Sequence, residues 1–414
     1  MIFKNKIVSL LGLFFIVTGI SYFSFDRFLP LSSQANSPQE SDSSTDPSDQ
    51  ETGFIVFQGP KTEVCPLNGT LHTAEEEALW SQRRPLLVMI ENHQDARPQS
   101  GLSNADVIYE AVAEGGITRF MAIFYCGILR GATQKYDLGP VRSARTYFLD
   151  LASEYSDYPL YAHVGGANCS APKDASGHSL ACTTATKAQA LEQLGQYGWM
   201  NKGTWSDLNQ FSLSYRVCRR EETRTGQDRD TEHTMYCSSD QLWQTAADRG
   251  LTNITEVNKK AWDLNFKSWS FDAEDKSVAV PTAQNTSFDF WSGYKQYSVS
   301  WQYDPATNSY LRFNNGEKQI DFNNQETLAA KNIVIQFVKE TRSVDEHLHN
   351  LYQVIGTGSG VLLQNGQKTD ITWSKSSRTA RTVFKTKSGQ VVNFVPGQIW
   401  IEILPSASTV DYEN

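Results

Sequence analysis

RPLLVMIENH, residues 84–93, places an unbroken apolar run directly before three polar residues. A continuous apolar run that stops at polar residues is typical of a strand buried on both faces of a sheet. The polar residues Glu91, Asn92 and His93 then lie at the carboxyl end of that strand, where open α/β sheets bind ligands. This stretch therefore predicts a central strand and a candidate site at its end.

The following stretch, DVIYEAVAEGGITRFMAIFYC (106–126), has two β-rich halves around a Glu-Gly-Gly turn. This pattern predicts a β-hairpin. A helix over residues 106–114 is the alternative interpretation, because three acidic residues spaced four apart would then share one helix face.

Residues 139–155 (GPVRSARTYFLDLASEY) begin with a Gly-Pro turn and continue with apolar residues at helical spacing. A short strand, PLYAHVGGA (159–167), and a second helix, TKAQALEQLGQYG (186–198), follow. Strand, hairpin, helix, strand and helix together predict an α/β or α+β domain over residues 57–245.

The second half of the chain changes character after a connection at residues 246–286. Short alternating runs such as YKQYSVSWQY, KNIVIQFVKE and QIWIEILP are joined by Asn, Gly, Asp and Pro turns. They predict a mostly antiparallel β domain over residues 287–405, followed by a tail at 406–414. The glycines of GTGSGV (356–361) precede no helix, so this segment is interpreted as a β turn and not as a dinucleotide loop.

The amino terminus predicts a membrane anchor. Lys4 and Lys6 precede an apolar run that ends at Asp26-Arg27, so residues 1–27 are expected to form a single transmembrane helix. A cleaved signal peptide is the alternative, with small residues for cleavage at 31–35. Residues 32–53 are almost devoid of apolar side chains, so residues 28–56 are predicted to form a disordered tether. The positive charges before the run place the bulk of the chain outside the cytoplasm.

Six cysteines follow the tether, and none forms the C-x-x-C spacing of a zinc site. Outside the cytoplasm, an even number of cysteines favours disulfides, and at least two are expected, in the short loops 169–182 and 218–237. Six reduced core thiols are the alternative. The residues concerned are Cys65, Cys126, Cys169, Cys182, Cys218 and Cys237.

The net charge of −9 comes without a basic stripe, so a nucleic-acid partner is not expected. The sequence also predicts no cofactor and no metal site, because His347-x-His349 has no third ligand in view. Arg378 and Arg381 are interpreted as exposed strand or turn charges.

Polar residues after predicted strands form the candidate ligand-binding set. Guanidinium groups bind phosphates and carboxylates, imidazoles titrate near neutral pH, and glycine lets a ligand approach the backbone. The alternative to ligand binding is that these residues serve the fold: the histidines through hydrogen bonds within the core, the arginines through ion pairs with nearby acids, and the glycines in a turn. The set is Asn92, His93, Arg97, Arg142, Arg145, His163, Gly165, Gly166 and His233, with Asp106, Glu110 and Glu114 as acids able to assist or to hold a metal.

Within this set, Arg142 and Arg145 stand three positions apart at the expected helix start. Residues at i and i+3 share a helix face, so both guanidiniums are expected to clamp one anionic group beside the helix N-terminus.

The segments RPLLVMIENHQDARPQSGLSNADVIYEAVAEGGITRFMAIF, GPVRSAR, LYAHVGGA and EHTMY strongly resemble the YerB-like family of bacterial lipoproteins, and residues from about 297 to PGQIWIEILP are similar to that family's carboxy-terminal domain. The resemblance implies a bacterial envelope protein with paired domains and no assigned activity. Members are often lipid-anchored through a cysteine after the signal peptide, whereas no cysteine precedes Cys65 here. The chain also has a fainter likeness to the LytR-CpsA-Psr glycopolymer transferases. Residue by residue, this likeness matches only Asp106 and one of Arg142 or Arg145.

These observations favour a membrane-tethered extracytoplasmic protein of the cell envelope that binds an anionic cell-wall component through an arginine and histidine pocket. An envelope phosphoryl- or glycosyl-transfer enzyme and a scaffold for envelope proteins are the two alternatives.

Overall fold

The computed structural model describes residues 57–128, 136–169, 171–274 and 281–413. The predicted anchor and tether, residues 1–56, lie outside the described residues. All of these described residues belong to one compact unit. Among the described residues, no helix has the length and apolar character needed to cross a bilayer.

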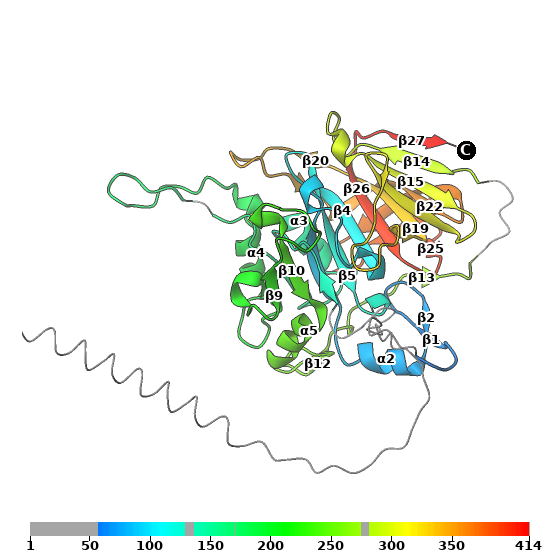
Figure 1. The fold of residues 1–414 in the computed structure, drawn as a ribbon, viewed down its shortest axis with the longest axis horizontal. Coiled ribbons are helices and arrows are strands. Elements are labelled where there is room, and N and C mark those ends of the chain that lie inside the picture. Colours follow the sequence, from blue (N-terminus) through cyan, green and yellow to red (C-terminus); the bar gives the residue numbers. More distant parts are fainter. Residues whose placement is uncertain (1–56, 129–135, 170, 275–280, 414) are drawn as a thin grey trace, which may run out of the picture. The chain divides into compact units, whose positions relative to one another are not determined.

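A ten-stranded mixed sheet runs through both halves of the chain (Figure 1). Its strands, in spatial order, are β24 Val383–Thr386, β23 Gln367–Lys375, β22 Gly356–Gln364, β19 Asn332–Val338, β26 Ile399–Pro405, β4 Val107–Glu114, β5 Ile117–Phe124, β3 Leu86–Glu91, β7 Leu160–His163 and β8 Asp207–Asn209. The two halves meet where β26 pairs with β4 in parallel, with Glu402 opposite Glu110. The carboxy-terminal half therefore completes the sheet that the amino-terminal half begins.

The strand predicted at residues 86–90 is β3, and each of its residues is buried. The predicted hairpin is β4 and β5, an antiparallel pair that turns at Gly115 and Gly116, both with positive φ. The helical alternative for residues 106–114 is wrong. Residues 107–114 form the strand β4, so Glu110 is buried within the sheet and Glu114 lies at the strand's end, with no helix face for them to share.

Helices are few and short. The α-helices of the described residues are α2 Ala74–Trp80, α3 Thr146–Ala152, α4 Ala190–Gln196 and α5 Ser239–Asp248. The 3-10 helices are η1 Gln94–Ala96, η2 Leu102–Asn104, η4 Thr186–Ala188, η5 Gln210–Ser212, η6 Thr231–His233 and η7 Lys295–Tyr297. The predicted helices after residues 145 and 186 are confirmed as α3 and α4, each shorter than expected, so the fold is strand-rich.

A second sheet covers the centre of the main sheet. Its strands are β17 Glu317–Lys318, β16 Ser309–Asn314, β15 Val299–Asp304, β14 Asn285–Phe288 and β27 Val410–Glu413, with β18 Ala329–Ala330 beside β16. The rings of Trp301 from β15 and Trp400 from β26 are both buried and lie 5.1 Å apart. Aromatic contact between the two sheets therefore forms part of the core.

The remaining strands form small sheets. They are β6 Asp137–Leu138, β10 Met235–Ser238 and β9 Cys218–Arg220; β1 Glu63–Val64 with β2 Leu71–His72; β11 Ile254–Thr255 with β12 Lys260–Ala261; β13 Ser270–Phe271 with β25 Asn393–Phe394; and β20 Glu340–Thr341 with β21 Leu351–Tyr352. The expectation of a β turn at 356–361 is wrong, because these residues begin β22, where Gly358 and Gly360 give room to Trp373 and the backbone of β19.

All six cysteines form disulfides, which confirms the expectation of at least two. The pairs are Cys65–Cys126, Cys169–Cys182 and Cys218–Cys237. The loop closed by Cys169–Cys182 is largely exposed and reaches away from the body of the fold (Figure 1). The bond between Cys218 and Cys237 joins directly opposed residues of β9 and β10.

Candidate functional site

Glu91, the last residue of β3, is the centre of the site. Its carboxylate accepts a hydrogen bond from Arg142 Nε at Oε1 (3.1 Å) and pairs with His233 Nδ1 at Oε2 (2.9 Å). Arg142 is positioned by its backbone N–H, which donates to Met89 O, and His233 ends the 3-10 turn η6. Three segments far apart in the sequence thus meet at one carboxylate.

A second histidine covers the first. The ring of His93 stacks on that of His233 with centroids 4.6 Å apart and planes 4° from parallel. His93 Nδ1 lies 3.4 Å from Asp95 Oδ2, and the backbone N–H of Asp95 donates to the same nitrogen. The hydrogen bond that His233 donates to Glu91 raises the pKa of His233, whereas burial and the neighbouring His233 charge lower the pKa of His93.

Arg145 does not share a ligand face with Arg142. It is the N-cap of α3 with an extended backbone, so the expected common helix face is wrong. The guanidinium of Arg145 binds Glu114, the last residue of β4, which also binds Arg119. Burial acts to raise the pKa of Glu114, but these two guanidiniums outweigh it and hold that pKa well below its usual range.

Backbone hydrogen bonds hold the segment after β7, which contains Gly165 and Gly166, beside the segment that carries Arg142 and Arg145. Ala144 N donates to Gly165 O, and Gly166 is so close to Ala144 and Leu191 that a side chain would meet both. His163 is buried, with Nδ1 at 2.6 Å from Gly165 O and Nε2 at 2.6 Å from Asp207 Oδ1. Both ring nitrogens are therefore engaged within the fold.

Asn92 turns away from Glu91, as successive strand residues do. Its side chain donates to Thr118 Oγ1 (2.8 Å) and accepts from Arg97 Nε (3.1 Å), while Arg97 Nη2 donates to the Asn92 carbonyl (3.0 Å). These contacts close the loop that carries His93 and Asp95.

Glu110 lies in a sealed cluster, to which Asn92 is joined by a hydrogen bond from its Nδ2 to Glu110 Oε1 (3.3 Å). Arg312 Nη2 is 2.5 Å from Glu110 Oε2, and Arg312 Nη1 is 2.7 Å from Glu402 Oε1, with all three side chains fully buried. Burial and the facing charge of Glu110 raise the pKa of Glu402 well above its usual value. Trp301 Nε1 also donates to Glu402. This cluster joins β4, β26 and β16.

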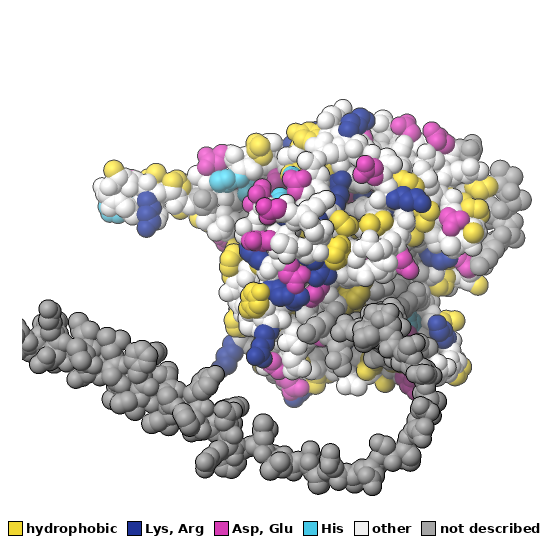
Figure 2. Space-filling model, in the orientation of Figure 1, with side chains coloured by type: hydrophobic (Ala, Val, Ile, Leu, Met, Phe, Trp, Pro, Cys, Tyr) yellow, Lys and Arg dark blue, Asp and Glu magenta, His cyan; other side chains and the backbone are white. Residues whose placement is uncertain are grey.

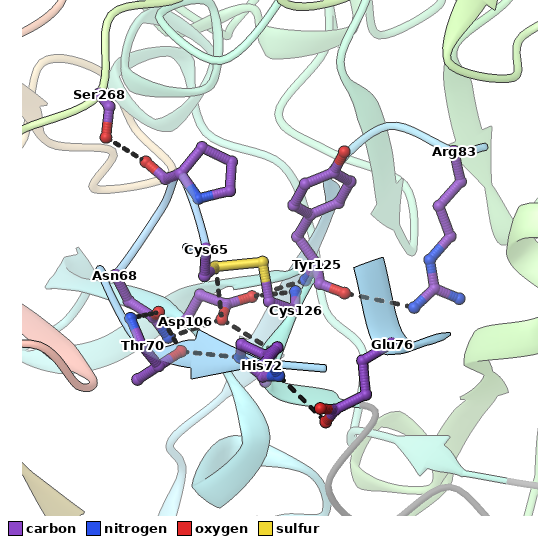
Figure 3. The surroundings of a disulfide bond; sticks show 12 residues. Cys65, Asn68, Thr70, His72, Glu76, Arg83, Asp106, Tyr125, Cys126 and Ser268 are labelled. Atoms are coloured by element: carbon purple, nitrogen blue, oxygen red, sulfur yellow. Dashed lines mark hydrogen bonds and ion pairs between the residues drawn. A yellow bond between two sulfur atoms is a disulfide. The ribbon is translucent and has the colours of Figure 1, made fainter. Parts of the chain in front are cut away.

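Asp106 directly precedes β4, at the opposite end of that strand from Glu114. Figure 3 shows it beside the disulfide between Cys65 and Cys126. Its carboxylate accepts the backbone N–H groups of Tyr125 (2.6 Å), Cys126 (3.1 Å) and Gly127 (2.9 Å), beside the Cys65–Cys126 disulfide. Eight residues of extended chain, about 26 Å, separate Asp106 from Glu114. Asp106 is therefore remote from Arg142 and Arg145. The likeness to the LytR-CpsA-Psr transferases implied that the aspartate and an arginine share one site, and the structure does not place them together.

The structure thus brings together His93, Arg142 and His233 of the candidate set, with Arg145 and the glycines as neighbours. Sequence reasoning missed Asp95, Arg312 and Glu402. A single charged residue within the apolar strands SYLRFN and IWIEILP was the available signal for the last two. On the face drawn in Figure 2, acidic and basic side chains are interspersed, without a wide basic area.

Comparisons with known proteins agree with this fold. A relative from Bacillus subtilis (strain 168), described as "Putative lipoprotein YerB", is 26% identical over 357 residues, which are 85% of this chain and 92% of the relative. The crystal structure of the YerB protein from Bacillus subtilis matches with a TM-score of 0.62 and 25% identity, covering 84% of this chain and 100% of that one.

Two family models match successive parts of the chain. Residues 69–252 match the N-terminal domain of a protein family of unknown function, DUF3048, and residues 288–401 match its C-terminal domain. Together the two matches cover more than half of the chain, and β4 and β26 join the matched regions in one sheet. The chain therefore belongs to the DUF3048 family and carries both of its domains.

Proposed function

We propose that this protein is a membrane-tethered, extracytoplasmic component of the bacterial cell envelope that binds an anionic group of a cell-wall component at Arg142. The description of the Bacillus subtilis relative as a lipoprotein supports the envelope location. Three disulfides in one chain support an oxidising compartment outside the cytoplasm.

The open side of Arg142 is the observation that carries the proposal. Arg142 uses only Nε to bind Glu91, and its side chain is 25% exposed. Its two Nη nitrogens have no recorded hydrogen-bond partner among the described residues. A guanidinium held from one side in this way can offer its outer edge to a phosphate or carboxylate.

The surroundings of Arg142 favour such a ligand over a random surface contact. Glu91 and the backbone of Met89 hold Arg142 in one position, which lowers the entropy lost on binding. His233, whose pKa is raised by Glu91, adds positive charge next to it when protonated. Arg145 is fully engaged with Glu114 and the Ala144 carbonyl and serves the fold.

Thermal unfolding of the full-length protein with and without phosphate, pyrophosphate and muropeptide-like carboxylates tests this function. Arg142→Lys keeps the charge but loses the planar fork, so the affinity for the stabilising anion is expected to fall at least about tenfold. The melting temperature of the free variant should stay close to that of the wild type.

Arg145→Lys is the matched control, because it makes the same substitution at a nearby arginine that binds Glu114 and not the proposed ligand. It should lower the melting temperature of the free protein while the anion still stabilises it. If none of these anions raises the melting temperature of the wild type, or if Arg142→Lys responds as the wild type does, the proposed site is incorrect.

A further inference from the structure

We propose that His93, Asp95 and His233 form a binding site for a divalent transition-metal ion. One ligand atom from each of these side chains lies within 4.8 Å of the others. Two imidazoles and one carboxylate are a ligand set that zinc, iron and related metals accept. The proposal goes beyond anion binding by Arg142, because a metal ion can bind these three residues without an anion.

His233 is prepared as a ligand by its contact with Glu91. The carboxylate lies 2.9 Å from Nδ1 and so holds a proton there, which leaves the lone pair of the neutral ring on Nε2. Histidines that bind metals commonly donate their second ring N–H to a carboxylate, which orients the ring and strengthens the ligand. Arg142 binds the other oxygen of Glu91 and keeps this carboxylate in place.

His93 and Asp95 offer a second, local pair of ligand atoms. His93 Nδ1 lies 3.4 Å from Asp95 Oδ2, about the separation of two ligands in a tetrahedral site with bonds of about 2.1 Å. The backbone N–H of Asp95 donates to the same Nδ1 over 3.3 Å, so this nitrogen is unprotonated, and a bound metal ion would replace this long hydrogen bond. The 3-10 turn Gln94–Ala96 sets this spacing, because it places Asp95 two residues beyond the ring.

Ring stacking between His93 and His233 is the structural alternative to metal binding. Stacking alone does not require a separate carboxylate beside each ring, whereas the structure provides Glu91 for one and Asp95 for the other. The His93 side chain is 24% exposed and that of Asp95 58%, so both can adjust and an ion can enter. Three protein ligands leave a further position for water or for an anion held by Arg142.

Metal titration of the full-length protein, purified in detergent without a histidine tag, tests the proposal. Zn²⁺ alone, followed by equilibrium dialysis and metal analysis, should fill a single site per chain. Co²⁺ alone should give the intense visible absorption of a low-coordinate site with nitrogen ligands. His93→Gln and His233→Gln should each weaken Zn²⁺ binding at least about 100-fold, and Asp95→Asn about tenfold.

The second histidine pair provides the matched control. His347 and His349 lie with ring centroids 5.7 Å apart, and Asp345 binds His349, but they complete no three-ligand group among the described residues. His347→Gln should bind Zn²⁺ as the wild type does. Asp95 is exposed, so Asp95→Asn keeps the fold and carries the test if a histidine variant unfolds. Absence of stoichiometric binding by the wild type, or equal binding by Asp95→Asn, would overturn the metal site.

Discussion

Two arginine–carboxylate clusters differ in their access to water, although the carboxylates of both come from the same sheet, one from β4 and β26 and the other from the end of β3. Arg312, between Glu110 and Glu402, is fully buried, as are both of its partners. Arg142 has a buried partner, Glu91, but its own side chain is 25% exposed. The same chemical groups therefore hold the two sheets together in one place and remain available to a ligand in the other.

The difference arises from what covers each cluster. The second sheet lies over Glu110 and Glu402, and the rings of Trp301 and Trp400 flank the Arg312 guanidinium at 5.1 and 4.5 Å. At the end of β3, the Glu91 carboxylate instead meets Arg142, which lies between elements, and His233 of the 3-10 turn η6. A charge under a sheet contributes through pairing in a low dielectric, whereas a charge at a loop edge is screened by water.

The largest expected effect is on the sealed cluster. Glu110→Gln removes the carboxyl that lies 2.5 Å from the fully buried Arg312 guanidinium, which should lower the free energy of unfolding by about 3–5 kcal/mol. Glu402→Gln is the matched control, because the raised pKa of Glu402 favours its neutral form and glutamine has a similar shape. Chemical denaturation at neutral pH should show a much smaller loss for Glu402→Gln, and equal losses would contradict the assignment of charge.

Glu114 should show an intermediate effect that depends on acid pH. Because its pKa is lowered in the folded state, its contribution is present above the unfolded value of about 4.3 and is lost as the pH falls through the folded value. Glu114→Gln should cost about 1.5–3 kcal/mol at neutral pH, less than Glu110→Gln because the Glu114 side chain is 30% exposed. Denaturation between about pH 5 and 2 should show a flatter profile for the variant. A parallel profile would disagree with this role.

Glu402 should act in the opposite direction. Its pKa is raised in the folded state, so its contribution is full below the unfolded value of about 4.3 and declines as the pH rises toward the folded value. The expected loss is about 1.4 kcal/mol for each pH unit within that window. Glu402→Gln should remove this decline in denaturation curves taken between about pH 5 and 8, and retention of the wild-type slope would argue that Glu402 is ionised.

The smallest effect on stability is expected at the open cluster. Arg142→Lys keeps a charge beside Glu91, and His233 still binds the other carboxylate oxygen. The free energy of unfolding should change by less than about 1 kcal/mol. A larger loss in chemical denaturation would show that Arg142 serves the fold as Arg145 does, and would remove the contrast between the two clusters.

Much of the strand pattern could be predicted from local sequence. The apolar run of β3, the hairpin of β4 and β5, and the alternating strands of the second half were predicted because burial and strand period leave a direct trace in sequence. The exposed interpretation of Arg381 was wrong: its side chain is buried, pairs with Glu154 and lies 3.5 Å over the ring of Trp269. A partner more than 200 residues away leaves no local trace.

The sequence predicted only part of the candidate site, because contacts between distant segments leave no local trace. Glu91 was recognised as a polar stop but not as the residue that joins Arg142 to His233, because a sequence shows strand ends and not the side chains that meet there. Asp95 was not proposed as a ligand, since its role depends on the 3-10 turn beside His93 and on a histidine that is distant in the chain.

The sequence by itself determined the strand-rich character, the cysteine content from which disulfides were expected, and the resemblance to one family, because these depend on local period, composition and extended motifs. Only the tertiary structure decided which charges meet. It paired Arg142 with Glu91 at the end of β3 and Arg145 with Glu114 at the end of β4. It also paired Arg312 with Glu110, because β26 joins β4 and the second sheet closes over both. Coulomb energy depends on distance and on the surrounding dielectric, and the packing of distant segments determines both.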